Sequence, residues 1–72
     1  MTAFIDRMIE KRTEQGLSKK ALAEKAGRER QVIENWEKRL SEPRLESAML
    51  IAKALGVSLD WLVGLTDTPK TA

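Results

Sequence analysis

The chain has 72 residues, of which 13 are Lys or Arg and 11 are Asp or Glu, and its formal net charge is +2. This length predicts one small domain, near the lower limit for a chain that folds without a disulfide or a structural metal. The chain has no cysteine and no histidine; this excludes disulfides and thiolate metal sites, removes the commonest general base and zinc ligand, and fits a reducing, cytoplasmic setting.

Apolar residues near the N-terminus recur at helical spacing. One side of a first predicted helix, roughly residues 3–15, consists of Phe4, Ile5, Met8 and Ile9. Gly16 is expected to end this helix. No long apolar run follows a basic start here, so a signal peptide is not expected. No stretch of the chain approaches the roughly eighteen apolar residues that span a membrane.

Two further helices, joined by a tight turn, are predicted for residues 19–26 and 29–38. Ser18 is a good N-cap for the first of them, because its hydroxyl can accept a hydrogen bond from an unpaired backbone N–H. Gly27 lies just past that helix, where a left-handed backbone costs glycine no Cβ clash and lets the chain turn. The predicted apolar faces are Leu22, Ala23 and Ala26 on one helix and Ile33 and Trp36 on the other.

A fourth helix is predicted after residues 38–44, a loop marked by Ser41 and Pro43. Gly56 is expected to end this helix. Its inner stripe is expected to contain Leu45, Ala48, Ala52 and Leu55, with Ile51 beside them. Met49 and Leu50 are expected to widen the apolar band that faces the core.

A short fifth helix is predicted to begin after Ser58, a second good N-cap. Leu59 and Leu62 are expected to pack inward, and Trp61 and Val63 to lie partly outside. Residues 66–72 are polar and lack periodicity, so they are predicted to form a flexible tail after a domain of residues 1–65.

The central residues have the spacing of a DNA-binding helix-turn-helix: Ala23, then Gly27 four residues later and Ile33 six further, with Leu22 and Trp36 outside them. Around this pattern stand GLS (16–18), LAEKAG (22–27), NWE (35–37) and IAKALGVSLDWL (51–62). With these segments, residues 4–64 resemble the XRE/Cro family of phage-repressor-like regulators. The resemblance implies an all-α, compact bundle of about five short helices, like the lambda-repressor DNA-binding domain. In it the second and third helices form a helix-turn-helix that binds operator DNA, usually as a dimer.

The resemblance also implies an ion pair between Arg12 and Glu37, because an arginine at this place in the family pairs with the glutamate of the WE dipeptide. Arg12 continues the apolar stripe of the first helix, which is an unfavourable place for a free charge. We therefore predict a partly buried bridge between the first and third helices. The alternative is that both side chains extend to water.

The third helix is predicted to present a polar face away from Ile33. Gln31 and Asn35 can each bind adenine N6 and N7, and Arg30 can bind guanine O6 and N7. The family reads bases from the positions of these three residues. Glu34 has two interpretations: it can accept from cytosine N4, or pair along the helix with Arg30 and Lys38.

Residues 19–44 hold the whole positive excess, with eight basic and five acidic side chains. An excess of this size is also common on solvated helices that bind nothing. Seven residues are candidates for contacts with DNA phosphates: Ser18, Lys19, Lys20, Arg28, Lys38, Arg39 and Arg44.

The sequence departs from the family pattern at several of these positions. Lys19 replaces a frequent glutamine, which keeps a point charge but loses the geometry of the amide. Arg28 and Glu29 replace a small apolar residue and a Ser/Thr cap. Arg39 replaces a frequent glycine, so the turn after the third helix must form without glycine's freedom or take another shape.

The C-terminal end commonly contributes to the dimer contact in the family, which makes Trp61, Val63 and Leu65 candidates for a homodimer interface. An outward Trp61 is a natural interface anchor. The alternative is that Trp61 covers the small core.

These observations predict a sequence-specific DNA-binding regulator, a repressor that binds a palindromic operator as a homodimer, without cofactor or metal, at the nucleoid in the cytoplasm. One alternative keeps the fold but makes the chain an antitoxin, another partner-binding module, or the DNA-binding domain of a longer regulator. A third interpretation is a small enzyme. It is disfavoured because, without histidine or cysteine, only carboxylates, lysines and hydroxyls remain; these lie on solvated helix faces and form no cleft of convergent groups.

Overall fold

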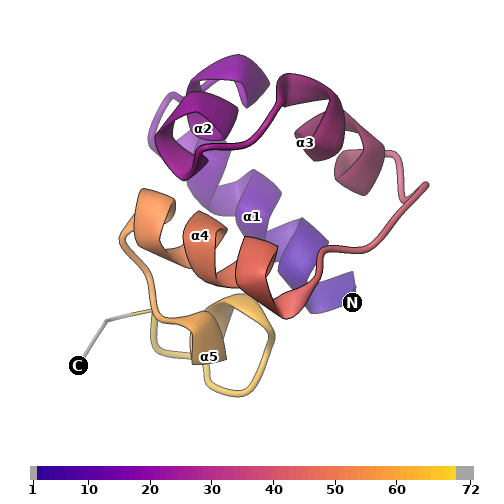
Figure 1. Cartoon of the computed structure of the whole chain (residues 1–72). Helices are drawn as coiled ribbons and strands as arrows, with labels where there is room; N and C mark the ends of the chain where they lie inside the picture. Colours follow the sequence, from indigo (N-terminus) through magenta and orange to yellow (C-terminus); the bar gives the residue numbers. More distant parts are fainter. Residues whose placement is uncertain (1, 70–72) are drawn as a thin grey trace.

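The computed structural model describes residues 2–69, which form five helices and no strand (Figure 1). The helices are α1 (Thr2–Glu14), α2 (Lys19–Ala26), α3 (Arg30–Glu37), α4 (Leu45–Leu55) and α5 (Leu59–Leu62). The predicted all-α fold is confirmed, and the first three helices begin and end within one residue of the predicted bounds. Within the described residues, no helix has the length and apolar composition needed to cross a bilayer.

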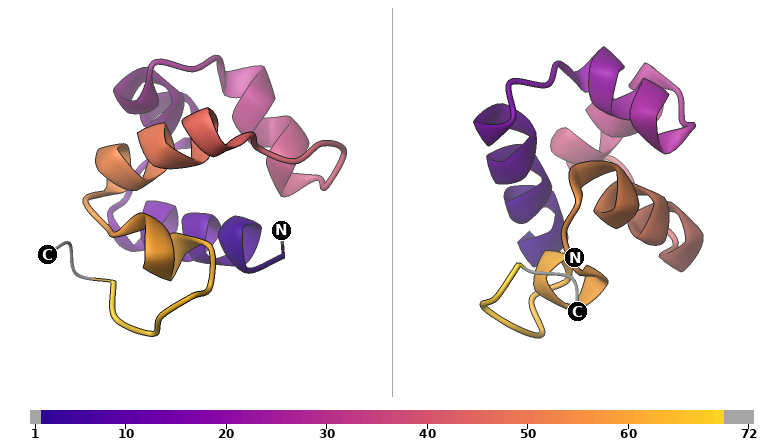
Figure 2. Two further views of the ribbon diagram at one scale, coloured as in Figure 1. Left: turned by 60° about the horizontal axis from the view of Figure 1, so that its bottom comes forward. Right: turned by 90° about the vertical axis from the view of Figure 1, so that its left-hand side faces the viewer.

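The helices surround one core in a fixed arrangement. α1 and α4 lie on opposite sides of the bundle, α2 and α3 cover one end, and α5 covers the other (Figure 2). The largest side chains without solvent exposure come from all five helices, so each helix is held by burial of its apolar face. These side chains are Phe4, Met8, Leu22, Ile33, Ile51 and Leu62.

Serine side chains cap two of the helices as predicted. The Ser18 hydroxyl accepts a hydrogen bond from the backbone N–H of Ala21 at 3.0 Å. The Ser58 hydroxyl accepts one from the N–H of Trp61 at 3.1 Å. Each cap pairs a backbone donor that the first turn of a helix leaves open, which determines where α2 and α5 begin.

The turn after α3 has the left-handed shape that a glycine would favour, although Arg39 occupies it. Arg39 has φ of 60°, the only positive φ of a non-glycine residue in the described chain. The N–H of Leu40 donates to the Asn35 carbonyl at 2.9 Å, and the N–H of Arg39 to that of Trp36 at 3.0 Å. These bonds form a helix-ending motif of the Schellman type. Gly27 has the same backbone shape after α2, with φ of 69°.

We therefore expect glycine to be more stable than alanine at both turns. Arg39→Gly should be more stable than Arg39→Ala by about 1 kcal/mol, because both lack the guanidinium and only glycine is free of left-handed strain. Gly27→Ala should lose about 1 kcal/mol; space is open around its Cβ position, so the cost is conformational. Urea unfolding would measure both changes. Equal stability of the glycine and alanine variants at position 39 would contradict this account.

The prediction of which α4 residues face the core is wrong for three of them. Ala48, Ile51, Ala52 and Leu55 are buried, but Leu45 is 65% exposed, Met49 54% and Leu50 39%. The reason is the rotation of the helix. Ser47 is also buried, so the inner face is centred between Ser47 and Ala52, and Leu45 and Met49 fall on the outer flank.

The prediction that Trp61 lies partly outside is also wrong, because only 5% of Trp61 is exposed. Two side chains of α1 cover its ring: the Arg7 guanidinium carbon lies 4.9 Å from the ring centroid and the Lys11 ammonium 5.6 Å. Long basic side chains can cover an aromatic ring with their aliphatic stems while their charges face the π-system. Trp61 thus covers the core, which was the alternative interpretation.

Residues 66–69 of the predicted tail make two backbone contacts with the bundle. The Thr66 carbonyl accepts a hydrogen bond from Arg7 Nη1 at 2.7 Å, and the Pro69 carbonyl accepts one from the N–H of Ser58 at 3.0 Å. The remaining residues of the predicted tail, 70–72, lie outside the described part of the chain.

Candidate nucleic-acid interface

The orientation of α3 is determined by two buried residues on its inner side. Ile33 has no solvent exposure and Trp36 is 3% exposed. The Trp36 ring meets the Phe4 ring edge-on, with centroids 5.9 Å apart and an interplanar angle of 88°. Aromatic pairs favour this arrangement, because the positive edge of one ring meets the negative face of the other. The opposite side of α3 is thereby held toward solvent.

A partly buried ion pair ties α3 to α1, at the position where the sequence predicts one. Arg12 Nε lies 3.0 Å from Glu37 Oε2, and Arg12 Nη2 donates to Glu37 Oε1 at 3.2 Å. The Arg12 and Glu37 side chains are 13% and 11% exposed. Arg12 Nη1 also donates to the Leu17 carbonyl at 2.9 Å, beside the start of α2. One guanidinium therefore connects α1, the loop before α2 and the end of α3. Its contact with Glu37 has the bidentate geometry that arginine favours with carboxylates.

The solvent side of α3 carries two amide side chains that contact each other. Gln31 Nε2 donates to Asn35 Oδ1 at 3.0 Å, one helical turn apart. Gln31 is exposed and Asn35 is half-buried. This bond uses one lone pair of the Asn35 oxygen; the other lone pair and both N–H groups of Asn35 can still pair with the edge of a base. The bond orients Asn35 before any base is bound.

Arg30 and Glu34 form an ion pair along the helix, with Arg30 Nε 3.4 Å from Glu34 Oε1. This contact is one of the two interpretations of Glu34. Because the Arg30 side chain is 62% exposed, the pair contributes little to stability. It holds the guanidinium beside the Gln31–Asn35 pair, on the flank of the outer face.

The candidates for phosphate contacts near α2 lie at its N-terminus. Lys20 is exposed and Lys19 is half-buried. Ser18 uses its hydroxyl oxygen to cap the helix. A helix N-terminus presents unpaired N–H groups and partial positive charge, so a phosphate placed there would meet backbone donors as well as both ammonium groups.

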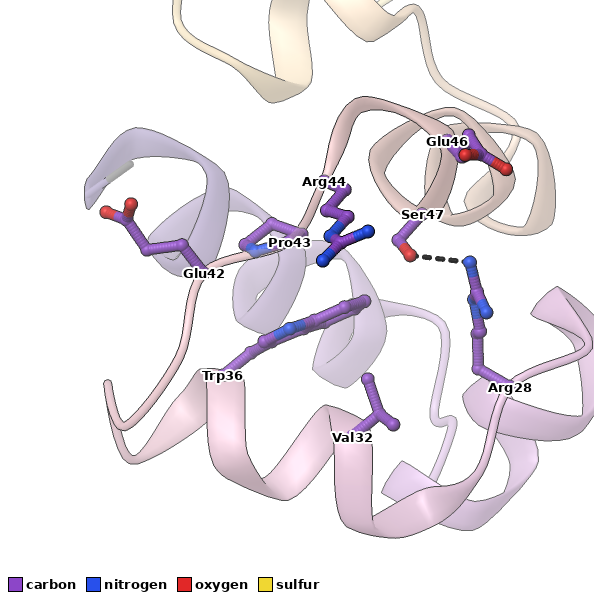
Figure 3. Close-up of a pocket in the computed structure, with 8 residues that line it drawn as sticks. All are labelled: Arg28, Val32, Trp36, Glu42, Pro43, Arg44, Glu46 and Ser47. Atoms are coloured by element: carbon purple, nitrogen blue, oxygen red, sulfur yellow. Dashed lines mark hydrogen bonds between the residues drawn. The ribbon is translucent and has the colours of Figure 1, made fainter.

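Arg28 and Arg44 line one pocket of about 430 Å³ between α3 and the start of α4 (Figure 3). Arg28 Nη2 donates to the Ser47 hydroxyl at 2.7 Å, so Arg28 also attaches the helix-turn-helix to α4. Its Nε is buried without a hydrogen-bond partner among the described residues. Arg44 precedes the first residue of α4, which receives no side-chain cap. The full lining is Arg28, Val32, Trp36, Glu42, Pro43, Arg44, Glu46 and Ser47.

Lys38 and Arg39 follow α3 directly and both are exposed. Arg39 Nη2 lies 2.8 Å from Asp6 Oδ1 of α1. Both of these side chains are more than half exposed, so a phosphate can compete for this guanidinium at little cost. Lys38 lies on the same side of α3 as Gln31 and Asn35.

Three supporting residues were not identified from the sequence. Ser47 holds Arg28, as described above. Gln15 Nε2 donates to the Leu55 carbonyl at 2.8 Å, which joins α1 to the end of α4. Arg7 donates to the carbonyls of Trp61 and Thr66. A polar side chain that bonds a distant carbonyl leaves no periodic signal, so these contacts depend on the tertiary structure.

A helix-turn-helix family model matches residues 8–62, which is more than half of the chain. The chain belongs to the XRE/Cro-type helix-turn-helix family. A search of curated proteins found no match. Membership makes this XRE-family chain a DNA-binding regulator, and the family is one of DNA-binding regulatory domains rather than of enzymes. In this family member, the helix-turn-helix is formed by α2, the turn at Gly27 and α3.

Proposed function

We propose that this XRE-family regulator is a repressor that binds a palindromic operator as a homodimer, with α3 of each copy in a major groove. The observation that supports this most is the outer face of α3, where the bonded amides Gln31 and Asn35 lie opposite the buried Ile33. A rigid helix that presents amides beside cations has the groups that read base edges. Repression would follow from occupying a site that polymerase needs.

We assign two roles to the surrounding residues. Arg30, Gln31 and Asn35 contact bases, whereas Glu34 holds Arg30 and contacts a cytosine only where that pair opens. Phosphate contacts give affinity without sequence choice. The residues in this second role are Ser18, Lys19, Lys20, Arg28, Lys38, Arg39 and Arg44.

Selection of bound duplexes from a random DNA library tests the proposal directly. We expect enrichment of a palindrome whose half-site centres lie about 34 Å apart, since a two-fold dimer places its two recognition helices one helical turn of DNA apart. Enrichment of a single asymmetric half-site would contradict the dimer but would still support base reading by α3. Binding without any enriched sequence would contradict base reading by α3.

Lys38→Ala is expected to weaken binding to all duplexes by a similar factor. The ammonium group contacts a phosphate in the proposed complex, so its loss should also reduce the slope of log affinity against log salt by about 1 per site. Fluorescence titrations at several salt concentrations would measure both effects. A change in base preference would show instead that Lys38 reads a base.

A further inference from the structure

The outer side of α4 carries three large apolar side chains that a single copy leaves in solvent. Leu45, Met49 and Leu50 are the exposed apolar residues of this helix. Single exposed apolar residues are ordinary on a small protein, but three within two turns of one helix form a patch. We call the exposed residues of this side the α4 face: Leu45, Glu46, Met49, Leu50 and Lys53.

The charges of the α4 face are complementary to themselves. Glu46 and Lys53 are the two charged residues of α4. At 100° per residue they lie within about 20° of each other around the axis, and about 10 Å apart along it. The midpoint between them falls between Met49 and Leu50. A two-fold axis through that point, perpendicular to the helix, would set Glu46 of each copy beside Lys53 of the other.

We propose that the α4 face is the homodimer interface and that a second copy packs there with its α4 antiparallel. Such an interface is isologous: the same patch on both copies, with Met49 near the axis and two Glu46–Lys53 ion pairs beside it. The inference rests on the proposed function in one respect: a palindromic operator requires a dimer. The α4 face replaces the predicted C-terminal interface, because Trp61, its predicted anchor, is buried.

The position of α4 in the bundle suits an operator-binding dimer. α4 lies on the side opposite α1, with α2 and α3 at one end of the bundle and α5 at the other (Figures 1 and 2). α4 runs across the direction that joins these two ends. A two-fold axis along that direction therefore makes the α4 helices antiparallel and leaves both helix-turn-helix units at the same end of the dimer.

The area of the α4 face predicts a weak dimer in free solution. One side of an eleven-residue helix is small against the roughly 800 Å² per partner that stable complexes bury. On a palindrome, each bound copy raises the effective concentration of the other at the interface, so association is strengthened there. Dimer formation and cooperative operator binding should therefore change together.

Charge reversal tests the interface in free protein by sedimentation equilibrium up to millimolar concentration. We expect the wild type to dimerise, and Glu46→Lys or Lys53→Glu to weaken dimerisation at least 10-fold, since each sets like charges together twice. The double variant Glu46→Lys, Lys53→Glu should return to within about 3-fold of the wild type, because its pairs are restored with opposite sign. Leu65→Glu should leave dimerisation unchanged, because Leu65 belongs to the C-terminal interface predicted from the sequence and not to the α4 face.

A second measurement uses the absence of cysteine from the chain. Met49→Cys should give a disulfide-linked dimer on oxidation with diamide, whereas Leu65→Cys, at a more exposed position, should remain mostly monomeric. Circular dichroism would verify that every variant is folded. A wild type that is monomeric at millimolar concentration, a double variant no stronger than the single ones, or dissociation by Leu65→Glu alone would overturn the proposal.

The same variants separate this inference from the proposed function. Lys53→Glu, which lies outside the pocket lined by Arg28 and Arg44, should bind one isolated half-site as well as the wild type and lose only cooperativity on the palindrome. If the charge-reversal pattern appears but no DNA sequence is enriched, the interface stands and the proposed function fails. If a palindrome is enriched but charge reversal changes neither dimerisation nor cooperativity, the interface is wrong and the function stands.

Discussion

Glu37→Ala is expected to lower the free energy of unfolding by about 3 kcal/mol, because it leaves the partly buried Arg12 guanidinium without its carboxylate. A domain of this size has a total stability of only about 5 kcal/mol, so the variant should retain only about 2 kcal/mol and unfold at a clearly lower temperature. Urea titration followed by circular dichroism measures the loss. The effect also reaches function, since the pair holds α3 against α1.

Two controls distinguish the loss of this buried carboxylate from the loss of a charge at the surface. Asp6→Ala removes the carboxylate of the exposed Arg39–Asp6 pair and should change stability by less than about 0.5 kcal/mol. Arg12→Met combined with Glu37→Leu removes both buried charges, so it should be clearly more stable than Glu37→Ala. A loss below about 1 kcal/mol in Glu37→Ala would mean that Arg12 reaches water without cost.

Asn35→Ala is expected to reduce discrimination at one base position of each half-site by about 10- to 100-fold, equivalent to about 1–3 kcal/mol. The side chain lies on the solvent side of α3 and its loss opens no core cavity, so stability should change little. Titration of duplexes that differ at single positions measures the change. Discrimination at positions away from the Asn35 contact should be retained.

Gln31→Met is the matched variant for the role of the amide pair. It keeps the length of the side chain but removes the N–H that donates to Asn35 Oδ1. If that bond orients Asn35, Gln31→Met should also reduce discrimination at the base that Asn35 contacts. If only a separate base position is affected, the two residues read independently. Uniform weakening by Asn35→Ala, like that expected for Lys38→Ala, would contradict base reading.

Much of the fold follows from local patterns in the chain. The apolar residues of α1, α2 and α3 recur at the helical period, and the residues that these patterns predict are buried, except Ile9, which is partly buried. Ser18, Ser58 and Gly27 mark helix ends because their effects depend on nearby backbone groups alone. The errors occur at α4 and α5, which are apolar on most sides. There periodicity does not tell which flank meets the core.

The candidate site was predictable to the same extent. The outer face of α3 follows from Ile33 and Trp36, because the inner side of a helix determines its outer side. The contacts that orient the site residues do not follow. The bond from Arg28 to Ser47 and the ion pair of Arg39 with Asp6 join residues far apart in the chain. Both constrain arginines that sequence reasoning treated only as free cations.

The sequence by itself determined the helical class, the helix-turn-helix and the polar face of α3, because these depend on spacing and capping within one or two helices. Only the tertiary structure decided which apolar side chains are covered. Trp61 is buried because Arg7 and Lys11 of α1 pack over its ring, and Met49 is exposed because the face of α4 that meets the core is centred between Ser47 and Ala52. Burial depends on what neighbouring helices bring to a surface, and that is a property of the packed bundle rather than of any one segment.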